Sequence, residues 1–311
     1  MKRVLALALV GALLPRVASA TDIFEKVGTY AAQFLKIGVS ARATGMGSAF
    51  TAVANDASAA YWNPAGLVDV QGTVVALHHT EWPADINVEY ANYTFAPTFI
   101  RGKMSLHARG LTMDPQVVRT VFRQDGTGEM FDAGDMSFGL SYARYFTDKF
   151  SAGITVSWVH MGIADRSVNP IVGDFGLQYR IGIRGMKLGM VVQSIGSEVN
   201  FDDRASKLPT VFKVGLAVDA YRAGPHAIIG VGEFSHPSDN KERQNFGVEY
   251  SYNEFVFLRS GYNVGFDAEN FAAGAGIALQ TSQSTSVDVD YSFVDMSALG
   301  SVHRVSLGFR Y

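Results

Sequence analysis

The feature that most constrains the fold is a period-two alternation of apolar and polar residues, which runs from about residue 73 to the end of the chain. The clearest stretch places four apolar side chains against four polar ones: Val287, Val289, Tyr291 and Phe293 against Ser286, Asp288, Asp290 and Ser292. Successive side chains of a strand point to opposite faces, so each such segment has one apolar and one polar face. Segments of about 9–11 residues with this pattern are typical of transmembrane β-strands.

A soluble β-sandwich would also alternate, but the strands predicted here are longer than its usual ~5–6 residues. The connections also alternate in length. Short turns are expected at residues 147–149, 184–186, 222–225, 253–254 and 281–284, and longer loops at 80–87, 113–135, 162–170, 196–209, 236–242, 264–270 and 295–301. Short turns at one end and long loops at the other are typical of outer-membrane barrels. Seven long loops predict about fourteen antiparallel strands, with both chain termini at the turn end.

Composition agrees with this all-β architecture and excludes several functions. Glycine makes up 32 of 311 residues and aromatic residues 12%, which suits a barrel with tapered packing and aromatic girdles. The net charge of −3 provides no basic surface for nucleic acid. The chain has no cysteine, which excludes disulfides, thiol catalysis and cysteine metal ligands.

The first 20 residues read as a signal peptide. Lys2 and Arg3 precede a short apolar run, and Ala18-Ser19-Ala20 resembles a cleavage site. The apolar run is too short to span a bilayer. We therefore expect export to the outer membrane of a Gram-negative type of cell.

Residues 21–70 differ from the rest because they lack the alternation. Residues 21–35 have near-helical apolar spacing and predict a short amphipathic helix, while residues 57–60 allow a second one. Residues 34–70 are rich in small side chains, which permit close backbone approach. We predict a signal peptide at 1–20, an N-terminal helical plug at 21–70 and a transmembrane barrel at 71–311.

Two short motifs in the plug invite functional interpretations. Gly45 and Gly47 begin like a dinucleotide-binding fingerprint, but the third glycine and the βαβ unit are missing, so tight packing against the wall is expected. The segment from Trp62 through Asn63, Pro64 and Ala65 to Gly66 is either the turn that starts the first strand or a gate.

Neither an enzyme nor a cofactor protein is expected. No HExxH, GxSxG or P-loop pattern occurs, and the seven histidines are scattered, so no metal site is predicted. Residues 125–129 have oxygen ligands suited to weak calcium binding, but they lack the full EF-hand pattern, so a solvated loop is the better interpretation.

The polar faces of the predicted strands carry charges that should point into the lumen. These candidates are Arg180, Lys213, Glu249, Asp288, Asp290, Arg304 and Arg310. Such charges favour a wet lumen, or a polar surface that grips the plug, over an apolar tunnel. Which of them pair depends on the barrel shear, which the sequence does not give.

The segment from Phe34 to Leu67 resembles the N-terminal signature of the PorV/PorQ family of outer-membrane barrels. That family is similar to the FadL-type channels, which carry an Asn-Pro-Ala motif matched here by Asn63-Pro64-Ala65 and have fourteen strands with an N-terminal plug. The terminal Phe309-Arg310-Tyr311 is similar to the aromatic insertion signal of such barrels.

The resemblance implies two functions. A PorV-like chain would be a non-enzymatic component of type IX protein secretion and surface attachment, with a secretion translocon and exported cargo proteins as partners and residues 113–135 and 196–209 as contact loops. A FadL-like chain would be a passive channel for hydrophobic small molecules. Outer-membrane lipid would surround the protein in both cases.

Overall fold

The computed structural model describes residues 28–201, 205–282 and 284–311. The predicted signal peptide, and residues 21–27 of the predicted helix, lie outside these residues. Among the helices of the described part of the chain, none has the length and apolar character required to cross a membrane.

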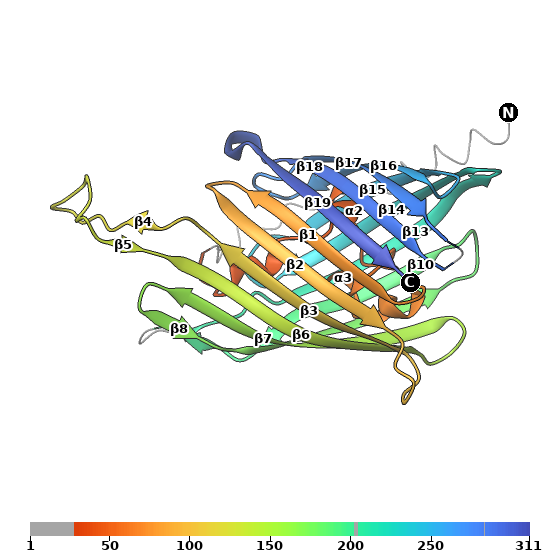
Figure 1. Cartoon of the computed structure of the whole chain (residues 1–311), viewed down its shortest axis with the longest axis horizontal. Coiled ribbons are helices and arrows are strands. Elements are labelled where there is room, and N and C mark those ends of the chain that lie inside the picture. Colours follow the sequence, from red (N-terminus) through yellow and green to blue (C-terminus); the bar gives the residue numbers. More distant parts are fainter. Residues whose placement is uncertain (1–27, 202–204, 283) are drawn as a thin grey trace.

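The wall is a closed antiparallel barrel of fourteen strands, as the alternation predicts (Figure 1). The strands, in order around the barrel, are β1 (Val74–Trp82), β2 (Ile86–Phe95), β3 (Lys103–Thr112), β6 (Ala133–Tyr145), β7 (Phe150–Ile163), β9 (Ile171–Arg180), β10 (Lys187–Gly196), β13 (Val211–Ala223), β14 (His226–Pro237), β15 (Arg243–Tyr252), β16 (Val256–Val264), β17 (Phe271–Gln280), β18 (Ser286–Asp295) and β19 (Ser301–Arg310). The first and last strands close the barrel, with β1 and β19 paired from Val74 opposite Arg310 to Glu81 opposite His303. Closure leaves no open sheet edge, which a membrane would not tolerate.

The apolar faces of the strands point outward. On β19, Val305, Leu307 and Phe309 are 42–47% exposed, whereas Arg304 and Ser306 are 4% exposed inside the barrel. The same parity holds on β18, where Val289 and Tyr291 face out. Lipid contact therefore falls on the apolar set, as predicted.

The seven connections expected as long loops lie at one end of the barrel, and the expected short turns lie at the other. The long loop expected at 80–87 is wrong, because β1 and β2 pair as far as Trp82 opposite Ile86 and leave only residues 83–85 between them, while the connection 96–102 at the turn end is longer. The longest loop contains a small hairpin, β4 (Gln116–Val117) and β5 (Met130–Phe131), that projects beyond the wall (Figure 1). Three further short strands also lie at the loop end: β8 (Arg166–Val168), β11 (Val199–Asn200) and β12 (Ala205–Ser206).

The lumen is filled by the segment before β1, which is less helical than predicted. It contains η1 (Gln33–Lys36), α2 (Ala41–Gly45), α3 (Ala59–Trp62) and η2 (Pro64–Asp69). The predicted helix at 21–35 is wrong for its described part, where Gly28 and Ala32 have positive φ and only the 3₁₀ turn η1 forms. The second predicted helix forms as α3, about two residues later than expected.

The first described part of the plug lies at the loop end, whereas the N-terminus itself, which is expected at the turn end, falls outside the described residues. Ala31 N–H donates to Lys207 O at 2.9 Å, and the Lys36 ammonium contacts Asp239 Oδ2 at 2.6 Å. Both partners belong to loops at that end. The plug thus runs from the loop end down to the start of β1. The start of β1 and the end of β19 both lie at the turn end.

Wall glycines allow the plug backbone to pack directly on the strands. A Cβ at Gly261 of β16 would lie 2.0 Å from Gly47 N, and one at Gly189 of β10 would lie 2.4 Å from Thr51 O. Gly153 and Gly247 have similar contacts, at 2.5 Å, with Pro64 C and Met46 O. The small residues of the plug are therefore matched by missing side chains on the wall.

This packing predicts that Gly261→Ala lowers the free energy of unfolding by about 1–3 kcal/mol, because the added methyl group overpacks the plug contact. Gly230→Ala is the control, since its Cβ would meet only Val218 at 3.8 Å, and we expect a change within about 0.5 kcal/mol. Denaturant unfolding in bilayers measures both variants. Equal effects would show that the plug does not press on the wall.

Candidate functional site: the clamped plug and the cavity above it

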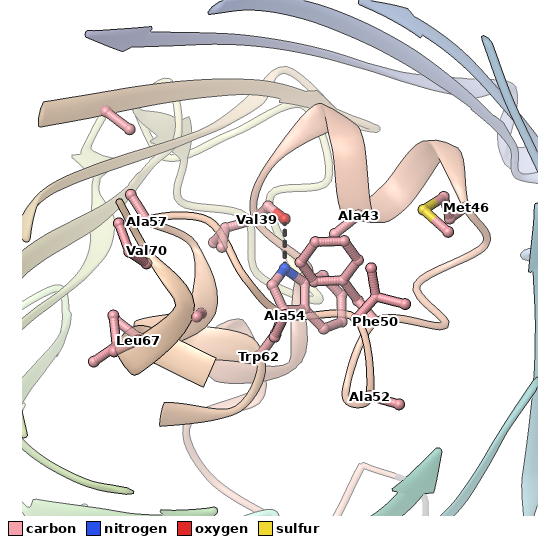
Figure 2. Close-up of a cluster of buried hydrophobic side chains, with 14 of the residues drawn as sticks. Val39, Ala43, Met46, Phe50, Ala52, Ala54, Ala57, Trp62, Leu67 and Val70 are labelled. Carbon is pink, nitrogen blue, oxygen red and sulfur yellow. Dashed lines mark hydrogen bonds between the residues drawn. The ribbon is translucent and has the colours of Figure 1, made fainter. Parts of the chain in front are cut away.

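The plug has a core of its own around Trp62. Trp62 Nε1 donates to Val39 O at 3.0 Å, and the Phe50 ring meets the indole edge-on at 6.1 Å between centroids (Figure 2). Both aromatic side chains are buried together with small residues of the same segment. The plug core is therefore a packed unit inside the barrel.

Lumen side chains satisfy the backbone of the plug. Glu233 Oε2 accepts Phe50 N–H at 3.0 Å and Thr51 N–H at 2.9 Å. Asn245 Nδ2 donates to Gly47 O at 2.7 Å. Buried backbone groups need partners, and this irregular segment finds many of them on the wall.

A network of buried charges joins α2 to the wall. The Arg42 guanidinium donates from Nε to Glu249 Oε2 at 2.9 Å and from Nη1 to Asp56 Oδ2 at 3.0 Å. Arg259 of β16 donates to Glu249 at 2.6 Å and to Asp290 at 2.5 Å. Burial opposes the charge on Arg42, but Glu249 and Asp56 outweigh it, so the pKa of the guanidinium is raised above its ordinary value.

The Asn-Pro-Ala-Gly segment is a corner docked on the wall. Asn63 Oδ1 accepts Ala65 N–H at 3.2 Å, while Nδ2 donates to Thr51 O at 2.9 Å and to Leu177 O of β9 at 3.1 Å. A Cβ at Gly66 would lie 2.0 Å from Ala54 O. The segment starts η2 and does not lead directly into β1.

A second group of charged contacts holds Asp69, the last residue of η2, at the barrel end that carries the short turns. Asp69 contacts the Lys187 ammonium at 2.8 Å and Arg180 at 2.5 Å, and it accepts the Tyr145 hydroxyl. Burial favours the neutral acid, but Lys187, Tyr145 and Arg180 outweigh it and lower the pKa of Asp69. Arg180 thus binds the plug at the exposed rim.

The other predicted lumen charges lie at different depths. Asp288 is half-buried and lies 3.7 Å from Arg310 near the turn end. Arg304 is 4% exposed and donates to Gly38 O at 3.2 Å. Lys213 lies 4.0 Å from Glu233 and 4.9 Å from the Trp62 ring.

Several plug-holding residues were not among the sequence candidates. Arg42, Arg109, Gln178, Glu233, Asn245 and Arg259 all contact the plug or its charge network. Their inward parity could have been read from the alternation of their strands, except for Arg42, which lies in the plug. Their partners could not, because pairing across the lumen depends on three-dimensional packing.

A cavity of about 500 Å³ lies between the plug and the loops. Its apolar lining includes Phe34, Ile37, Trp82, Leu111, Val211, Phe266 and Val294. Its polar lining includes Ser48, Gln193, Lys213, Glu233, Arg243, Asn245, Glu269 and Arg304. The guanidinium groups of Arg243 and Arg304 lie over the rings of Phe266 and Trp82, at 4.4 and 5.5 Å. The cavity can accept a molecule with an apolar body and a polar group.

The network predicts that Glu249→Gln destabilises the folded barrel by about 3–5 kcal/mol, because two buried arginines lose their shared carboxylate. Glu254→Gln, in the exposed turn that follows the same strand, should change stability by less than about 0.5 kcal/mol. Unfolding in bilayers gives both values. A loss below about 1 kcal/mol at Glu249 would mean that the network contributes little.

Comparison with family models gives one match. The model described as an uncharacterised protein family, UPF0164, matches residues 12–98, which include the plug and β1 and β2. A search of the curated proteins gives no match.

Comparison with solved structures gives the fold. The chain is similar to a Pseudomonas aeruginosa FadL homologue (TM-score 0.56, 11% identity, covering 88% of this chain and 98% of that one). It is also similar to the Ralstonia pickettii toluene transporter TbuX (0.59, 13%, 88% and 97%) and the P. putida toluene transporter TodX (0.59, 10%, 88% and 96%). The chain is therefore an outer-membrane type of barrel with a FadL-like fold.

Proposed function

We propose that this protein is an outer-membrane channel for small molecules that combine an apolar body with a polar group. The observation that carries the proposal is the cavity of about 500 Å³ inside the lumen, which is lined by residues of the plug, of the wall and of the loop-end connections. The fold that the chain shares with the two toluene transporters, TbuX and TodX, supports a small hydrophobic substrate. The charges in the cavity favour a substrate that is not a pure hydrocarbon.

The position of the cavity fits uptake from the loop end, which in this proposal faces the outside of the cell. Phe266 and Glu269 of a loop line one part of it, and Ser48 and Trp62 of the plug line another. A molecule entering there meets the plug before it reaches the turn end. The same barrel wall would contact outer-membrane lipid, and the chain would reach that membrane through its signal peptide.

A matched pair of substitutions on β13 tests the proposal, with 1-naphthol as the probe. Val211 lines the cavity and is buried, so Val211→Phe should weaken binding by about tenfold or more. Val214→Phe, three residues along on the outer face, should bind as the unchanged protein does. Equilibrium dialysis in detergent measures both. Absence of saturable binding by the unchanged protein, or equal binding by both variants, would contradict the proposal.

A PorV/PorQ-like role in type IX secretion is the second candidate. The polar side chains of the lumen hold the plug and therefore do not favour this role over a channel. The role is supported by the resemblance of residues 34–67 to the PorV/PorQ signature and by one surface feature. At the tip of the β4–β5 hairpin, Val121 and Phe122 are 85% and 97% exposed, as in a partner contact.

This second role predicts that Phe122→Ser reduces recovery of a translocon or cargo protein in affinity purification from native membranes. Val118→Ser, in the same hairpin and less exposed, is the control. Mass spectrometry of the purified material measures both. Recovery of the barrel without protein partners would remove this role and leave the channel proposal standing.

A further inference from the structure

A small enclosed chamber of about 40 Å³ lies between the wall and the first part of the plug. Leu35 and Tyr61 of the plug close one side, and strands β2, β3, β6, β7, β9 and β10 form the rest. Three buried polar atoms of its lining side chains have no hydrogen-bond partner: the Tyr90 hydroxyl, His107 Nδ1 and Arg109 Nε. Buried polar groups are normally paired, so this concentration of three requires an explanation.

Arg109 is a buried cation on which the carboxylate of Asp135 acts only from beyond ion-pair distance. Its terminal nitrogens donate to Leu35 O, at 3.3 Å, and to Ile37 O, and its guanidinium lies 5.4 Å from each of the Phe34 and Tyr61 rings. It makes no ion pair with any residue in the described ranges. A buried unpaired charge costs several kcal/mol, which carbonyl groups and rings offset only in part.

The three groups of the chamber that lack a partner can all act as donors. Arg109 Nε–H can only donate, and the Tyr90 hydroxyl has a proton to give. His107 Nε2 lies 3.3 Å from the Ser157 hydroxyl, and when it accepts that proton, Nδ1 carries the ring N–H. Asp174 also lines the chamber, where its Oδ1 accepts Ser194 N–H at 2.7 Å, and its carboxylate is the group in the lining that opposes a bound anion.

We propose that this chamber is a binding site for one small inorganic anion of the halide class. The anion accepts from Arg109 Nε, the Tyr90 hydroxyl and His107 Nδ1, and it neutralises the buried guanidinium. A chamber of about 40 Å³ has room for a particle of water or chloride size. A water molecule accepts only two hydrogen bonds and carries no charge, so it would leave one donor and the cation uncompensated.

The site would stabilise the start of the plug, because the same arginine holds the carbonyls of Leu35 and Ile37. This inference does not depend on the proposed channel function. It concerns the chamber behind Leu35 and Tyr61 and needs no occupant in the larger cavity.

Crystals soaked in sodium bromide test the site directly. We expect an anomalous bromide peak in the chamber, next to Arg109 and Tyr90. We also expect thermal unfolding of the full-length protein several degrees higher in chloride or bromide than in gluconate of equal ionic strength, because gluconate is not an anion of the halide class. Ordinary water density without an anomalous peak, together with identical unfolding in the three salts, would overturn the proposal.

Tyr90→Phe keeps the ring and removes one donor, so half-saturation should require about tenfold more bromide. Tyr142→Phe is the matched control, because its hydroxyl lies outside the lumen and donates to Arg101 O at 2.6 Å. An unchanged bromide response in Tyr90→Phe would also overturn the proposal.

Discussion

The structure depends on satisfying an irregular backbone inside a closed barrel. Residues 37–70 form only short helical turns, so many of their N–H and C=O groups have no partner within the segment. Buried peptide groups without partners would cost more than the packing gains. The inner face of the wall supplies the partners, with Glu233 accepting two plug N–H groups and Asn63 joining Thr51 to Leu177. The polar lumen is therefore the surface on which the plug folds.

This requirement gives the polar side chains of the lumen a structural role in holding the plug. The carboxylates of Glu249 and Asp290 face inward, but both form ion pairs with arginines: Arg42 and Arg259 contact Glu249, and Arg259 also contacts Asp290. Wall glycines such as Gly261 bring the plug backbone against the strands. The space that remains lies toward the loops, where apolar and charged side chains share one cavity. A polar lumen and a channel for partly hydrophobic molecules are thus compatible.

Much of the wall can be predicted from the sequence because strand alternation is a local property. The fourteen strands and the outward face of β18 and β19 follow from it, whereas the long loop expected at 80–87 does not form, because β1 and β2 pair as far as Trp82 opposite Ile86. The charge network does not, since Arg259 meets Glu249 through barrel register and Arg42 through the fold of the plug. Gln178 shows the same limit: parity places it inside, but only the fold shows that it donates to Ala54 O at 3.1 Å.

The plug was predicted less well because its conformation is set by its surroundings. Apolar spacing in residues 21–35 suggested a helix, yet residues 28–36 follow contacts with the loops and form a single 3₁₀ turn. The position of this segment at the loop end also has no local signal, because it depends on long-range partners such as Asp239. Short helices gain most of their stability from tertiary packing, so spacing alone is a weak guide.

The most direct test of a wall-clamped plug is native-state hydrogen exchange of the full-length protein in detergent. If the lumen side chains hold the plug as described, amides of residues 41–66 exchange as slowly as those of β14, while amides of residues 113–132 exchange rapidly. Exchange of residues 41–66 at the rate of the loop would contradict the account, because it would show that the plug opens independently of the wall.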